Sequence, residues 1–170
     1  IISDTHFGHA GVCRFTNEDG TKLRPWDHPD AMDEDLIKNY NSVVKPTDKC
    51  YFLGDMVINR RALVQIGRLN GDKVLIKGNH DIFKLEEYTK YFRDIRGCMV
   101  LHNILFSHIP VHPESKGRFA ANVHGHLHGN HIKDANGNRD PWYINVCVEN
   151  TNFYPIAMDE VVNRVKMLNE

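Results

Sequence analysis

Five short apolar runs that read as strands in this chain are followed at once by polar residues. In open α/β sheets the carboxyl ends of the strands line the crevice where ligands bind. The side chains of these clusters should therefore meet in one place, and only a fold that brings five strand ends together satisfies the pattern. The five clusters are Asp4-Thr5-His6, Gly54-Asp55, Gly78-Asn79-His80-Asp81, Ser107-His108 and His124-Gly125-His126-Leu127-His128.

The order of the elements predicts the fold class. In the first half, strands at 50–53 and 74–76 alternate with helical spacing at 32–43, 63–69 and 85–92, which indicates a parallel or mixed sheet. The second half is rich in strands, at 98–101, 104–106, 122–123, 142–146 and 154–157, with a hairpin turn at Asn136-Gly137 and a final helix at 159–168. We expect an α/β (α+β) fold and, at this length, a single domain over residues 1–170.

Composition limits the binding partners and the cellular location that we expect. The net charge is −1 with histidine neutral, so there is no signature of strong nucleic-acid binding. No apolar stretch approaches the length of a membrane span, and we expect no membrane association. The four cysteines form no C-x-x-C pair and read as reduced thiols. No secretory leader is recognisable, and the expected location is cytoplasmic.

The polar clusters combine carboxylate oxygen with imidazole nitrogen. That combination favours Mn²⁺, Fe²⁺, Zn²⁺ or Ni²⁺ over Ca²⁺ or Mg²⁺, and the absence of thiolates argues against a structural zinc finger. The glycines at 54, 78 and 125 suggest a backbone that turns sharply beside an ion. Each motif alone has an ordinary explanation, such as a capping Asp or a surface loop. Their common position at strand ends favours a metal centre.

With these motifs in this order, the chain resembles the calcineurin-like metallophosphoesterase superfamily, and more narrowly its small single-domain bacterial and phage members. The resemblance spans residues 1 to 128. It implies a four-layer αββα sandwich of two mixed β-sheets with two metal ions at one edge. The chain lacks the Asp-Arg that follows Gly-Asp in the protein phosphatase branch, and Asp81 stands where that branch has Glu. The resemblance therefore does not extend to protein Ser/Thr phosphatases.

The resemblance also implies roles for individual residues. Two divalent ions are expected, with Mn first and Fe, Ni or Zn as alternatives. His80 is expected to be catalytic, facing the substrate and oriented by Asp81. Asp55 is expected to bridge the ions. The first ion would also take Asp4, His6 and His128, and the second Asn79, His108 and His126.

The implied function is a metal-dependent phosphoric ester hydrolase, in which a hydroxide held between the two ions attacks phosphorus in line. We expect a phosphorylated small molecule or nucleotide as substrate, with a phosphodiester favoured over a phosphomonoester. The alternatives are a phosphatase of phosphoproteins or small molecules, a catalytically silent metal-binding scaffold, and a nuclease. Candidate substrate-binding residues, each of which has an ordinary alternative as a loop or surface residue, are His9, Arg24, Arg60 and Arg118.

Overall fold

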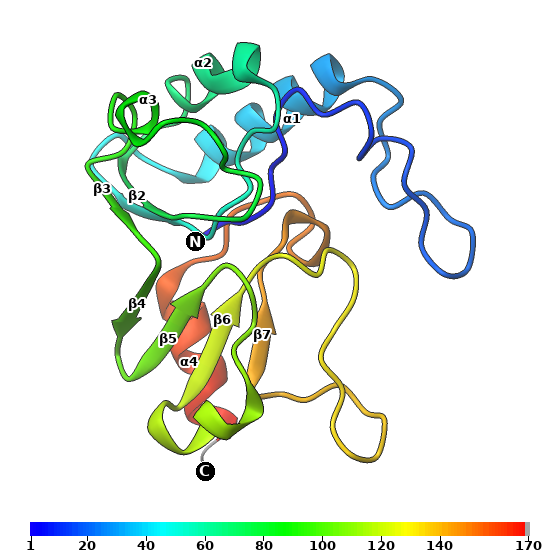
Figure 1. Cartoon of the computed structure of the whole chain (residues 1–170), viewed down its shortest axis with the longest axis vertical. Helices are drawn as coiled ribbons and strands as arrows, with labels where there is room; N and C mark the ends of the chain where they lie inside the picture. Colours follow the sequence, from blue (N-terminus) through cyan, green and yellow to red (C-terminus); the bar gives the residue numbers. More distant parts are fainter. Residues whose placement is uncertain (169–170) are drawn as a thin grey trace.

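Two β-sheets with flanking helices form the frame of this computed structural model, which describes residues 1–168 (Figure 1). The first sheet is parallel throughout, in the order β1 (Lys49–Phe52), β2 (Asp72–Ile76), β3 (Asp94–Arg96). The second is mixed: β4 (Cys98–Leu101) runs antiparallel to β5 (Ile104–Ser107), which pairs in parallel with β6 (Ala121–His124), and β6 with β7 (Tyr143–Asn145). The expected α/β class is confirmed, although only one of the two sheets is mixed.

The helices follow the apolar spacing of the sequence: the first and last cover the expected ranges, whereas the second and third end earlier than expected. The four α-helices are α1 (Pro29–Val43), α2 (Leu63–Ile66), α3 (Leu85–Tyr88) and α4 (Met158–Leu168). Short 3₁₀ helices span Arg60–Ala62, Pro113–Arg118 and Val148–Asn150. The α1 helix begins at a proline, whose fixed φ suits a first helical position, and it buries Met32, Leu36 and Tyr40 at spacings of four.

Alternate residues of the first sheet supply two different cores. Phe52 of β1 packs with Tyr40 at a ring distance of 5.6 Å and with Phe92 at 5.4 Å, in the cluster that joins the sheet to α1. Leu53 and Ile76 belong to the other cluster, with residues of β5, β6, β7 and α4. Because side chains alternate across a strand, one sheet serves both cores.

One expected strand does not form, and one strand forms that was not expected. Residues 154–157 do not form a strand: Pro155 has no N–H to donate, and only Ile156 is buried there. Asp94–Arg96 is a strand that the sequence did not indicate, because Ile95 is its only apolar residue and all three are at least partly exposed. The expected turn at Asn136-Gly137 is confirmed, between the paired residues Lys133 and Arg139.

The chain start lies between the two sheets. Ile2 pairs with Phe52 of the first sheet, whereas Ser3 pairs with Cys147, which follows the last strand of the second. The next residue, Asp4, is therefore held where the carboxyl ends of β1, β2, β5 and β6 come together. Within residues 1–168, no helix is both long and apolar enough to cross a membrane.

We predict that Phe52→Ala lowers the free energy of unfolding by about 3–5 kcal/mol, because it empties a fully buried ring position. Urea denaturation measures the change. Val100→Ala, at an exposed position of β4, should change stability by no more than about 0.5 kcal/mol. Similar losses in the two variants would contradict the core position of Phe52.

Candidate metal centre

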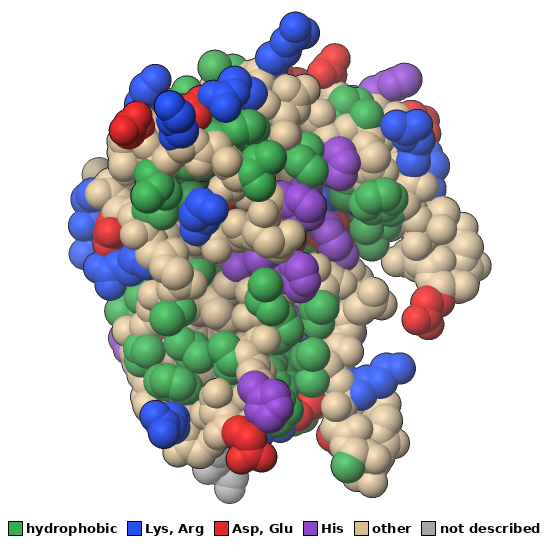
Figure 2. Space-filling model, in the orientation of Figure 1, with side chains coloured by type: hydrophobic (Ala, Val, Ile, Leu, Met, Phe, Trp, Pro, Cys, Tyr) green, Lys and Arg blue, Asp and Glu red, His purple; other side chains and the backbone are tan. Residues whose placement is uncertain are grey.

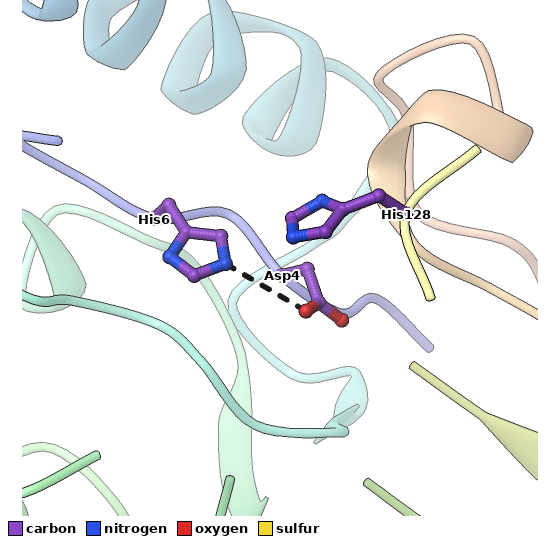
Figure 3. Close-up of side chains that lie close together, drawn as sticks. All are labelled: Asp4, His6 and His128. Carbon is purple, nitrogen blue, oxygen red and sulfur yellow. Dashed lines mark ion pairs between the residues drawn. The ribbon is translucent and has the colours of Figure 1, made fainter. Parts of the chain in front are cut away.

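Two groups of side chains converge at the seam between the sheets. Asp4, His6 and His128 form the first group, drawn in Figure 3, in which the two imidazoles and the carboxylate turn toward one another. Asp55, His108 and His126 form the second. Within each group the ligand atoms lie within 4.8 Å of one another. These are His/Asp groups that can bind metal ions, and they contain six of the seven ligands expected from the sequence.

The carboxylate of Asp4 is anchored through one oxygen and presents the other. Its Oδ2 accepts the backbone N–H of His126 at 2.9 Å and lies 2.5 Å from the Ser3 hydroxyl and 3.2 Å from the Cys147 sulfur. Its Oδ1 is buried without a hydrogen-bond partner within residues 1–168 and lies 3.7 Å from Nε2 of His6. Two ligands of one ion, each ~2.1 Å from it, lie roughly 3–3.5 Å apart. The separation is close to that of two ligands of one cation and too long for a hydrogen bond.

The two carboxylate oxygens of Asp55 also have separate contacts, as those of Asp4 do. Its Oδ1 accepts the backbone N–H of His80 at 2.8 Å. Its Oδ2 lies 3.3 Å from Nε2 of His108 in the second group and 3.9 Å from Nε2 of His6 in the first. The same oxygen therefore faces both groups, as a bridging ligand must.

The hydrogen bonds of His108 leave a lone pair pointing into the second group. Its Nδ1 lies 2.7 Å from the Leu53 carbonyl oxygen, which can only accept, so a neutral ring carries its proton there. The Nε2 lone pair then faces Oδ1 of Asn79 at 2.9 Å and Oδ2 of Asp55. Three acceptors thus converge, and a cation between them satisfies all three. Asn79, the seventh expected ligand, joins the second group through this contact.

The first group also contains buried polar atoms that the protein leaves unpaired. Both ring nitrogens of His6 are buried without a hydrogen-bond partner among the described residues. Buried polar atoms are normally paired, and each unpaired one costs about 1–3 kcal/mol. For Asp4, burial favours the neutral acid, but the contacts with His6 and His108 outweigh it and hold the pKa of the carboxyl below its ordinary value. The carboxylate and imidazole groups of this cluster fit a divalent cation as ligands by their number, charge and orientation.

Backbone strain is concentrated at the same residues. Nine non-glycine residues among those described have positive φ, and five of them are expected ligands. A left-handed conformation costs an L-residue about 1–2 kcal/mol, so it persists only where the surroundings enforce it. The five, with φ between 49° and 69°, are Asp4, His6, Asp55, His126 and His128.

Two glycines allow the strand ends to approach each other. A Cβ on Gly125 would lie 2.0 Å from the Ser3 hydroxyl oxygen and 2.3 Å from Oδ2 of Asp4, and one on Gly78 would lie 2.2 Å from Oδ1 of Asp55. Neither glycine has positive φ. Their role is therefore close approach to the anchoring oxygens, instead of the sharp turn that the sequence suggested.

His128 is held by a buried ion pair. Its Nδ1 lies 3.0 Å from Oε1 of Glu149, and that oxygen accepts from Nε of Arg24 at 2.8 Å and lies 2.7 Å from its Nη2. Burial alone would raise the pKa of Glu149, but the Arg24 charge and the His128 contact hold it below its ordinary value. With its Nδ1–H donated to Glu149, His128 presents Nε2 to the first group.

Arg24 is therefore not a substrate-binding residue, which corrects the expectation from the sequence. Its side chain is fully buried and donates to the carbonyl oxygens of Thr5 at 2.8 Å and Asp4 at 2.5 Å. It supports the strained backbone around the first group. Against the three carboxylates of Asp4, Asp55 and Glu149 it supplies one positive charge, so the formal sum is −3 + 1 = −2. A buried excess of negative charge favours bound cations.

His80 lies at the exposed mouth of the centre, and its ring centroid is 5.8 Å from that of His6. The expectation that Asp81 orients it is wrong. Asp81 is completely buried, and its carboxylate accepts the backbone N–H groups of Asp55 at 2.9 Å, Met56 at 3.0 Å and Gly78 at 2.8 Å. Asp81 ties together the loops that follow β1 and β2, and it makes no hydrogen bond with the His80 ring in the described chain.

The remaining substrate-binding candidates separate by position. His9 lies beside the centre, with its ring 5.5 Å from that of His6, and burial is the main reason that its pKa falls to about 4. Arg60 is exposed, lies over the Phe83 ring at 4.8 Å and pairs with Glu87. A substrate contact by either residue stays a prediction.

Arg118 lies in the wrong place for this role. It lines a cavity of about 960 Å³ with Ile104, Ala120 and Val165, at the starts of β5 and β6. The expected ligands His108 and His126 follow the opposite ends of those two strands. The expectation that Arg118 binds substrate is wrong, because the length of the sheet separates it from the centre.

Sequence reasoning missed the residues that hold the ligands in place. Glu149 orients His128, and Cys147 and Ser3 contact the anchoring oxygen of Asp4. Burial and then the Asp4 charge raise the pKa of the Cys147 thiol well above its ordinary value, so it stays protonated. The signal that was available is the acid after the apolar run 146–148, the same strand-end pattern that identified the ligands.

We predict that a divalent metal such as Mn²⁺ stabilises the protein. An ion at about 100 times its dissociation constant adds about 2.7 kcal/mol, or roughly 5–10 °C in melting temperature for a chain of this size. Differential scanning calorimetry, with and without Mn²⁺, measures the shift. An unchanged melting temperature in saturating metal would argue against a metal centre.

We predict that Glu149→Gln weakens Mn²⁺ binding by about 10–100-fold, because His128 loses the carboxylate that orients it. The change also leaves Arg24 buried without its counter-charge, which costs about 3–5 kcal/mol of stability. The double variant Arg24→Met/Glu149→Gln should regain only part of that stability, because the carbonyl oxygens of Thr5 and Asp4 lose their donor, and it should not regain affinity. Calorimetry measures both quantities, and Glu160→Gln, at an exposed carboxylate of α4, is the control. Normal affinity in the double variant would contradict the positioning role.

Comparison of the whole chain with known proteins shows its family. No protein-family model matches the chain. The crystal structure of the protein of unknown function AQ665 from Aquifex aeolicus has a similar fold, with a TM-score of 0.66 and 25% identity, covering 95% of this chain and 96% of that one. Uncharacterized protein MJ1445 of Methanocaldococcus jannaschii is 34% identical over 182 residues, covering 98% of this chain and 90% of the relative. The chain therefore belongs to the same family as MJ1445.

Proposed function

We propose that this protein is a two-metal phosphoesterase that hydrolyses a phosphodiester. The observation that carries the proposal is the Oδ2 atom of Asp55, which faces His6 of one ligand group and His108 of the other. Two ions that share one carboxylate lie ~3.5–4 Å apart, the spacing found in two-metal hydrolases. Mn²⁺ is the first candidate because the donors mix carboxylate, amide oxygen and imidazole.

In this proposal, the ligands hold two ions and His80 transfers a proton. When bound, the two ions would activate a water molecule and neutralise charge on the phosphoryl oxygens. His80 is exposed at the mouth, and its backbone N–H is tied to Asp55. From there its imidazole would donate a proton to the leaving oxygen. Water adds its oxygen to phosphorus and loses a proton to solvent, and the bond to the leaving oxygen breaks with its electron pair passing to that oxygen.

The finer architecture and the substrate belong to the same proposal. The core that joins Leu53 and Ile76 of the first sheet to Phe106 and Val123 of the second supports two packed sheets, as in the four-layer αββα sandwich of metallophosphoesterases. A diester is favoured because the chain lacks the Asp-Arg of the protein phosphatase branch, and the small single-domain members that it resembles in this respect are more often phosphodiesterases.

Hydrolysis of bis(p-nitrophenyl) phosphate against p-nitrophenyl phosphate tests the proposal directly. We expect Mn²⁺-dependent release of nitrophenolate, faster from the diester, and loss of activity in chelator. Preference for the monoester would select a phosphatase instead. Metal binding without cleavage of either ester would select the silent scaffold.

We predict that His80→Ala lowers kcat by about 10²–10⁴-fold and leaves metal content unchanged, because His80 transfers a proton and is not a ligand. Steady-state kinetics and elemental analysis measure the two quantities. His28→Ala is the matched control, since His28 is exposed and makes no side-chain capping bond at the start of α1. Loss of metal from His80→Ala would contradict its assigned role.

We predict that Asp55→Asn removes both activity and tight binding of both ions, since one oxygen of Asp55 serves both groups. Isothermal titration calorimetry with Mn²⁺ gives the stoichiometry. Two tightly bound ions in Asp55→Asn would exclude the bridge.

A further inference from the structure

A groove opens beside the candidate metal centre. Its inner part is a cavity of about 340 Å³, bounded on one side by the loop that carries His126 and His128. Two loops project on the same side of the molecule, and Figure 2 shows a notch between them. The other residues of the inner part that matter for binding are Phe15, Glu18, Leu23, Leu127, Gly129 and Asn130.

The inner groove suits a flat, uncharged group. Phe15, Leu23 and Leu127 supply apolar surface, and the lining contains no Lys or Arg. Phe15 is 48% exposed, so part of its ring is open to a ligand in the groove. Glu18, the only carboxylate of the lining, offers an acceptor for hydroxyl or N–H groups and disfavours an anion at this position.

The Phe15 ring is held next to the metal centre. It meets the His9 ring edge-on at 6.0 Å and 85°, and His9 in turn lies 5.5 Å from His6. A Cβ on Gly11 would lie 2.6 Å from Nε2 of His9, so the close backbone helps to fix this ring. A ring that stacks on Phe15 would thus be attached close to a phosphate at the centre.

The outer part of the groove carries positively charged side chains, whereas the lining of the inner part has no Lys or Arg. A second cavity of about 400 Å³ shares Glu18, Gly129 and Asn130 with the first and adds His131, Lys133 and Arg139. Lys133 and Arg139 lie directly opposite each other in an antiparallel pair, and both are exposed. Like charges in this position repel, and neither forms an ion pair with any residue in 1–168. An anion bound between them would relieve the repulsion.

Resting on the proposed function, we propose that the groove binds the organic side of a phosphodiester, and that this side is a nucleoside carrying a second phosphate. The reacting phosphate lies at the metal centre, the base stacks on Phe15, and the second phosphate lies between Lys133 and Arg139. The near-neutral charge of the whole chain does not oppose this, because the recognition is local.

Two synthetic esters separate the parts of the proposal. Thymidine 5′-(p-nitrophenyl phosphate) carries the nucleoside, and its 3′-phosphorylated derivative adds the second phosphate. In both, water adds to the 5′ phosphorus, nitrophenolate leaves with the bonding electron pair, and the water proton passes to solvent. We expect kcat/KM to rise from bis(p-nitrophenyl) phosphate to the nucleoside ester, and by about fivefold more with the 3′-phosphate.

Variants assign each gain to its residues. Phe15→Leu keeps the apolar contact and removes the ring, and it should raise KM for both nucleoside esters about tenfold. Lys133→Gln/Arg139→Gln should remove only the gain from the 3′-phosphate. The controls are Val100→Ala, which is 49% exposed on β4, and Lys38→Gln/Lys45→Gln, which removes two exposed charges on and after α1. Equal effects of the control variants would overturn the assignment.

Binding gives a readout that does not depend on turnover. Isothermal titration calorimetry should show thymidine 3′,5′-bisphosphate binding more tightly than thymidine 5′-monophosphate to the wild type, and equally to Lys133→Gln/Arg139→Gln. If the wild type cleaves bis(p-nitrophenyl) phosphate with Mn²⁺ but gains nothing from the nucleoside or the 3′-phosphate, this inference fails and the proposed function stands. If no ester is cleaved and no Mn²⁺ binds, the proposed function fails.

Discussion

The convergence of buried acceptors at the seam of the two sheets is the constraint on which the rest of this structure depends. Asp4 and Asp55 each give one oxygen to a backbone N–H group and turn the other toward imidazole nitrogens that lie 3.3 to 3.9 Å away. In a buried environment such an arrangement is costly unless a cation completes it. The hydrogen bonds of the surrounding loops hold the acceptors together in spite of this cost.

The strained backbone and the buried ion pair belong to the same arrangement. Five expected ligands have positive φ, and Arg24 bonds the carbonyl oxygens of two adjacent residues, Asp4 and Thr5, while its partner Glu149 holds His128. The protein thus gives up folding stability to hold the expected ligands in this arrangement, which is common where a site must be organised before its ligand arrives. The exposed side of the centre, with His80 at the mouth and the groove past Phe15, remains accessible to a substrate.

Much of the fold and the side-chain groups that can bind metal could be predicted from the sequence, because both depend on local patterns. Apolar runs of strand length ending in Asp, Asn or His reveal strand ends, and parallel strands bring such ends to one edge. Predictions for charged residues outside these runs were poor. Arg24 and Arg118 look alike in the sequence, yet one is fully buried under the ligands and the other lies at the far end of the sheet.

The sequence by itself determined the α/β class, the residues available as ligands and the likeness of their order to a metal-dependent hydrolase. Only the tertiary structure decided that Asp55 faces both groups, that Asp81 binds backbone N–H groups instead of His80, and that Glu149 orients His128. The physical reason is that these contacts join residues separated by 21 (149 − 128) to 53 (108 − 55) positions, and no periodicity within a strand or helix encodes which side chain a carboxylate will meet.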